Sequence, residues 1–213
     1  MQNFFNELNK NIQEAVKQEF SQIKLKVGKE KIYAVAFVTD SDCITLWLGV
    51  NTYEYLKKKD ADIDAEFGDK EAFIKEFGSS MSIDEIEEFR NASPETTKWY
   101  PDEWGYSDGN NSALNKISEQ LYKKQESLNT EEKSGYEVLF FETITSALQE
   151  LIKSGVLQDD LGEITYFITM TDDDRAPVIE KYSAEILNSE KKYKEFIKEA
   201  GYINEEGIEL HFD

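Results

Sequence analysis

Apolar residues recur at helical spacing in several stretches of the chain, and each stretch predicts a helix. The first stretch predicts a helix over residues 3–20. The broadest apolar stripe predicts the longest helix, near residues 130–154, with Lys153 suited to the negative end of its dipole. Further helices are predicted around Leu114, Ile117 and Leu121, and over residues 51–59, 71–77, 82–91, 177–187 and 190–200. Residues 23–28 fit either a strand or a continuation of the first helix.

Three other stretches are β-branched, aromatic or alternating, as strands are. Residues 32–39 and 43–50 flank a turn of Asp-Ser-Asp composition and predict an antiparallel hairpin. Residues 164–170 are apolar on both faces and predict a central strand, while residues 208–212 predict a short edge strand. The economical fold is α+β, with helices against one face of a mainly antiparallel sheet of about four or five strands. We expect one domain over residues 1–213.

The net charge of the chain limits the classes of binding partner that we expect. The formal net charge is −20, and the first 50 residues carry six acidic and six basic residues, so the whole acidic excess lies beyond them. Such a surface argues against nucleic acid and against anionic membranes, and it favours a basic protein or a cation. Solubility alone would also explain it. With a single cysteine, no secretion signal and no long apolar run, the chain is expected in the cytoplasm, without a membrane partner.

The chain lacks the usual residues of several catalytic machines. Its single histidine, His211, lies next to the C-terminus, where a catalytic base would be poorly held. Cys43 is expected to be a small buried hydrophobe. Neither glycine-rich nucleotide-binding motif occurs. We therefore expect no catalytic residue, no cofactor and no enzyme activity.

Two acidic clusters leave cation binding open. Residues 60–71 have the carboxylate spacing of an EF-hand calcium loop, but Ala65 stands where glycine permits the sharp turn. A solvated acidic loop is the simpler interpretation. Asp172, Asp173 and Asp174 follow a predicted strand and would suit magnesium, or Asp174 caps the following helix. No residue is assigned to a metal.

The most distinctive segment is residues 98–106, KWYPDEWGY, which we name the aromatic loop. Its proline and glycine exclude a regular helix, so its aromatic rings either anchor the loop to the core or form a recognition surface. Tryptophan and tyrosine dominate interface energetics, and the neighbouring carboxylates would suit a basic partner. The expected partner-binding residues are Trp99, Tyr100, Asp102, Glu103, Trp104 and Tyr106.

Three segments together resemble one bacterial family: residues 32–40, residues 51–54 and the aromatic loop. The family is an uncharacterised domain of unknown function with a "YAFAL-TD" strand, an "NT-E" helix start and a "KW-P-EW" loop. The resemblance spans nearly the whole chain and brings no catalytic residues. Some relatives of this general sort look like immunity proteins, which are small, acidic and non-enzymatic. We therefore expect a non-enzymatic cytoplasmic binding protein, an immunity-type inhibitor of a basic toxin or effector. A metal-dependent enzyme or sensor and a structural homo-oligomer are the alternatives, and the sequence leaves the oligomeric state open.

Overall fold

The computed structural model describes residues 1–67, 82 and 96–203. The helices and strands follow in the order α1 (Gln2–Val27), β1 (Ile32–Thr39), β2 (Trp47–Thr52), α2 (Tyr53–Phe67), η1 (Pro101–Glu103), β3 (Tyr106–Ser107), α5 (Ala113–Glu126), α6 (Thr130–Lys153), β4 (Thr165–Met170), α7 (Ala176–Leu187) and α8 (Glu190–Glu199). The predicted helices over residues 71–77 and 82–91, the predicted strand over residues 208–212 and His211 lie outside the described residues.

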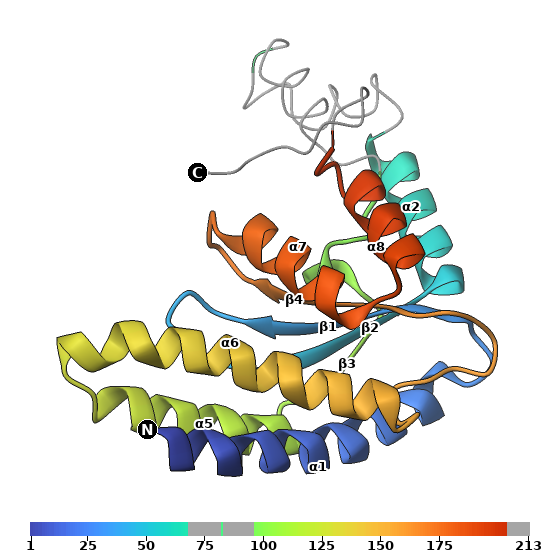
Figure 1. The fold of residues 1–213 in the computed structure, drawn as a ribbon. Helices are drawn as coiled ribbons and strands as arrows, with labels where there is room; N and C mark the ends of the chain where they lie inside the picture. Colours follow the sequence, from blue (N-terminus) through green and yellow to red (C-terminus); the bar gives the residue numbers. More distant parts are fainter. Residues whose placement is uncertain (68–81, 83–95, 204–213) are drawn as a thin grey trace.

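Four strands form one mixed sheet in the order β3-β2-β1-β4. β1 pairs with β2 and β2 with β3 in antiparallel fashion, whereas β1 and β4 run parallel. The α+β class and the mainly antiparallel sheet are confirmed. The expectation that helices cover one face is wrong: α1, α5 and α6 lie on one face, and α2, α7 and α8 lie on the other (Figure 1).

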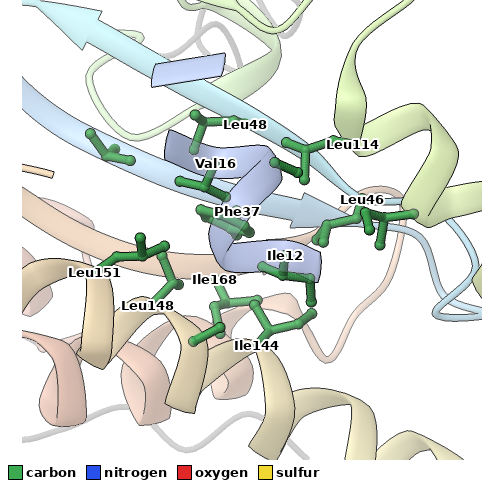
Figure 2. Close-up of a cluster of buried hydrophobic side chains, with 14 of the residues drawn as sticks. Ile12, Val16, Phe37, Leu46, Leu48, Leu114, Ile144, Leu148, Leu151 and Ile168 are labelled. Atoms are coloured by element: carbon green, nitrogen blue, oxygen red, sulfur yellow. The ribbon is translucent and has the colours of Figure 1, made fainter. Parts of the chain in front are cut away.

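The larger core, which we name the helical core, lies between the sheet and α1, α5 and α6. Figure 2 shows Ile12 and Val16 of α1 facing Phe37 of β1, with aliphatic side chains of α6 beside them. The periodicity predicted this face well. Its fully buried members include Leu8, Ile12, Val16, Phe37, Leu48, Leu114, Leu121, Phe140, Ile144, Leu148, Leu151 and Ile168.

The smaller core, the aromatic core, lies on the opposite face of the sheet. β1 turns Ala34, Ala36 and Val38 toward this side, and the small alanines leave room for large rings. β1 also contributes Tyr33, and the remaining buried members come from other segments: Leu56, Trp104, Phe167, Ala184, Phe196 and Ile197.

β4 is an edge strand of the described sheet, so its predicted central position is wrong. Every residue of β4 is buried because helices cover both of its faces, and this produces the apolar pattern of a central strand. The outer backbone groups bond to side chains of α7 and of the residue after it. Asn188 accepts from Tyr166 N at 2.9 Å and donates to Tyr166 O at 2.6 Å, and Ser183 Oγ accepts from Ile168 N at 2.8 Å.

Smaller boundaries also differ from the predictions. Residues 23–27 continue α1, which ends before Gly28 at φ 67°. β2 begins only at Trp47, because buried Cys43 adopts φ 56° in the preceding turn. Asn51 belongs to β2 rather than capping a helix. Among the described helices, none combines the length and the apolar character needed to cross a membrane.

Candidate functional site

The aromatic loop is fastened to the sheet by a buried hydrogen-bond network. The carbonyl oxygen of Lys98 accepts from Tyr33 Oη at 2.7 Å and from Trp104 Nε1 at 3.1 Å. The Asn51 side chain donates to Tyr33 Oη at 3.0 Å and accepts from Gly105 N at 3.4 Å. Buried polar groups are costly unless paired, so this network holds both ends of the loop in one position.

The two tryptophans of the loop complete the aromatic core. Trp104 is only 8% exposed, and its ring meets those of Tyr33 and Phe167 edge to face. Trp99 is half-buried, with its ring 4.9 Å from that of Phe196. Trp104 therefore offers little surface to a partner and supports the loop from within the core, while the partner-binding role predicted for it stays a prediction.

The other predicted partner-binding residues divide between support and exposure. Tyr106 is half-buried in β3, and its hydroxyl donates to Glu30 at 2.8 Å. Burial, followed by the bond to Glu30, raises the pKa of Tyr106 to about 12. Tyr100 is 55% exposed, and Asp102 and Glu103 are exposed beside it. These last three residues are the part of the predicted surface that a partner can contact, and partner binding through them stays a prediction.

A cavity of about 600 Å³ opens directly beside the aromatic loop. It lies at the carboxyl end of β4, between the loop, the N-terminus of α7 and the C-terminus of α8. The described lining residues are Thr96, Trp99, Tyr100, Pro101, Asp102, Thr169, Met170, Thr171, Asp172, Ala176, Pro177, Glu180, Glu199, Ala200 and Tyr202. The structure thus brings Trp99, Tyr100 and Asp102 together with Asp172, which the sequence placed in a separate cluster.

Glu180 is the lining residue that sequence reasoning missed. It lies in α7 and is 7% exposed. Its carboxylate accepts hydrogen bonds from Thr169 Oγ1 and Tyr202 Oη. Burial outweighs these two bonds and raises the pKa of Glu180 to about 7. The sequence did contain a sign of this site. Glu180 lies on the same helix face as the buried Ala184 and Leu187, where a carboxylate is unusual.

The cavity carries an excess of negative charge. Burial, and then repulsion from Asp172 and Glu103, raises the pKa of Asp102. Glu199 is neutralised by Lys98, whose Nζ lies 2.7 Å from its carboxylate. The same Nζ lies 5.1 Å from the ring centre of Trp99. Asp102, Asp172 and Glu180 have no ion-pair partner among the described residues.

Within the described residues, neither acidic cluster has the arrangement of a cation site, and residues 68–71 of the first cluster lie outside the described residues. Asp60 lies inside α2 and binds Thr96 and Thr97, so the first eight residues of the supposed calcium loop are helical. Asp173 pairs with Arg175 at 2.7 Å, which lowers the pKa of Asp173. The helix cap predicted for Asp174 is wrong, because Arg175 occupies that position. Within the described ranges, no three acidic, histidine or cysteine side chains converge well enough to hold a metal ion.

Comparison with known protein families gives one match. Residues 12–189 match a domain of unknown function, DUF4303. The match includes all three segments that carried the resemblance and the strand and helix that line the cavity, β4 and α7. No curated protein and no solved structure matches the chain. The matched range covers most of the sequence, and the chain therefore belongs to the DUF4303 family.

Proposed function

We propose that this protein is a non-enzymatic binding protein whose partner is a basic protein. The observation that carries the proposal is the exposed edge of the aromatic loop. There Tyr100 is exposed beside Asp102 and Glu103, of which Glu103 is paired with Lys59 at 2.7 Å, next to a cavity with uncompensated carboxylates. An exposed tyrosine supplies contact area at low entropic cost, and carboxylates around it steer a basic partner into place.

The attachment of the loop supports a recognition role. A loop fixed by Trp104, Asn51 and the Lys98 carbonyl loses little freedom when a partner binds. Such preorganisation improves affinity without adding contacts. The rest of the surface helps at longer range, because a net charge of −20 accelerates encounter with a cationic protein.

An immunity-type inhibitor of a basic toxin is the specific form of this activity that we favour. A toxin active on nucleic acid has a basic surface, and an acidic inhibitor would cover it. This form predicts that co-expression protects cells from a toxin encoded nearby. The broader proposal requires only that the partner be basic and contact the loop.

The test is a charge reversal at the exposed edge. Asp102→Lys together with Glu103→Lys should weaken binding of the partner captured by the wild-type chain by at least about tenfold, the effect of a charged hydrogen bond or two. Asp160→Lys, on an exposed turn before β4, is the matched control and should retain binding. A partner that is acidic, or that binds both variants equally, would refute the proposal.

A further inference from the structure

The cavity beside the aromatic loop has a chemistry more specific than general acidity. Its volume of about 600 Å³ lies within the range of roughly 300–1,000 Å³ typical of ligand sites. Its described lining includes four carboxylates and no lysine or arginine. One carboxylate, Glu199, is already paired with Lys98. Three carboxylates therefore surround the cavity without a cation.

These carboxylates are placed for an extended cation rather than a point charge. They come from three separate elements: Asp102 from η1, Asp172 from the turn after β4, and Glu180 from α7. They do not converge into a metal-binding group among the described residues. A guanidinium group spreads five N–H donors over a plane, so it can reach dispersed acceptors that one metal ion cannot.

The walls of the cavity suit the stem and the planar face of such a group. Pro101, Met170, Ala176 and Pro177 provide apolar surface for methylene groups. Tyr100 is 55% exposed at the rim, where a guanidinium can stack on its ring. The buried Trp99 Nε1 has no hydrogen-bond acceptor within the described residues. A buried donor without an acceptor is unusual. A guanidinium has only donors, so the acceptor would have to be a carbonyl oxygen of the peptide that carries the arginine.

We propose that this cavity receives one arginine side chain of the basic partner, with its guanidinium group between Asp102, Asp172 and Glu180. This inference rests on the proposed function and deepens it, because it names the group that the partner must present. Burial raises the pKa of Glu180 and, together with repulsion from Asp172 and Glu103, that of Asp102, and a cation bound between these carboxyls would lower both pKa values.

The experiment titrates the full chain with the capped tripeptide acetyl-Gly-Arg-Gly-amide and follows backbone amide and tryptophan indole signals by NMR. The matched probe replaces arginine with citrulline, which has the same shape and no charge. We expect the arginine peptide to shift the Trp99 indole signal and the Thr171 and Asp172 amides. The citrulline peptide should bind at least about tenfold more weakly, as expected for loss of charged hydrogen bonds.

Two substitutions locate the site on the protein. Glu180→Gln is isosteric and keeps a hydrogen-bonding side chain, and Asp172→Asn suits the φ of 52° at that position. Each should weaken the arginine peptide by about threefold or more, while Glu119→Gln on the distant helix α5 and Asp160→Asn should not. Equal binding of the arginine and citrulline peptides, or signal shifts confined to other regions, would overturn the inference. So would tighter binding of a third peptide, acetyl-Gly-Lys-Gly-amide, in which lysine replaces arginine.

The outcome separates this inference from the proposed function. If the arginine peptide is silent at millimolar concentration but the charge reversal at Asp102 and Glu103 still abolishes partner binding, the cavity is not the recognition site and the exposed edge is. If the arginine peptide does not bind and the charge reversal does not weaken partner binding, the proposed function is refuted as well.

Discussion

The helical core and the aromatic core lie on opposite faces of one sheet, yet they are built from different residues. The helical core consists mainly of aliphatic side chains on three long helices, with few polar groups among them. The aromatic core joins rings from the two strands β1 and β4, the aromatic loop and α8, and buried polar groups run through it. The cavity and the buried Glu180 both adjoin the aromatic core. The helical core therefore serves packing alone, while the aromatic core packs the opposite face of the sheet and also borders the candidate site.

The largest expected effect tests whether the cores on both faces of the sheet contribute to the free energy of unfolding. Trp104→Ala should lower the free energy of unfolding by about 3–5 kcal/mol, because it empties the centre of the aromatic core. Leu148→Ala, in the helical core, should cost about 2–5 kcal/mol. Urea unfolding of both variants measures the comparison. A loss below about 1 kcal/mol for Trp104→Ala would show that the loop is not part of the fold's core.

The next effect concerns Glu180, the buried carboxylate beside the aromatic core. Between pH 4.5 and 7 the unfolded chain releases the proton of Glu180 while the folded chain keeps it, so this residue lowers stability as pH rises. Glu180→Gln removes that dependence. Between pH 4 and pH 8 the variant should gain about 3 kcal/mol of stability relative to wild type. If the free energy of unfolding of the variant and of the wild type changed with pH in the same way, the raised pKa of Glu180 would be contradicted.

A smaller effect tests the close fit of the loop. A Cβ atom on Gly105 would lie 2.5 Å from the Tyr55 ring, so Gly105→Ala should cost about 1–3 kcal/mol through overpacking. Gly109→Ala is the matched control, since nothing lies within 4 Å of its Cβ position. Thermal unfolding of the two variants gives the answer. Equal melting temperatures would mean that the loop moves freely away from α2.

An effect of the same size as that of Gly105→Ala concerns the side chains that bond to the outer edge of β4. Asn188→Ala removes the partners of both Tyr166 N and Tyr166 O and should cost about 1–3 kcal/mol. The Tyr166 amide should also exchange with solvent faster, whereas exposed Asn110→Ala should change neither quantity. Unchanged exchange at Tyr166 would show that α7 shields the edge by packing alone.

The same contrast explains which features the sequence could predict. Helical spacing of Ile144, Leu148 and Leu151 depends only on local periodicity, so the long helix α6 and its buried face were predicted closely. The predicted central position of β4 is wrong because the apolar pattern of a strand shows only whether its two faces are buried. The pattern does not show whether another strand pairs with each of its edges. The sequence does not decide whether Trp104 lies in the core or on the surface, because the residues of an irregular loop follow no periodic pattern of burial.

The candidate site was predictable only in part. The aromatic loop stood out by composition, and the family resemblance drawn partly from it is confirmed. The cavity was not predictable, because Tyr100 is distant in sequence from Asp172 and Glu180, and the three residues come to line one cavity only in the folded chain. A carboxylate on an apolar helix face was the one local sign of it.

The outer edge of β4 has a consequence for how this protein meets other chains. With Asn188 and Ser183 already bonded to its peptide groups, β4 cannot template an incoming strand. The opposite edge of the described sheet is β3, which is only two residues long. Within the described residues, the bonded edge of β4 and the short edge of β3 therefore both disfavour edge-to-edge aggregation.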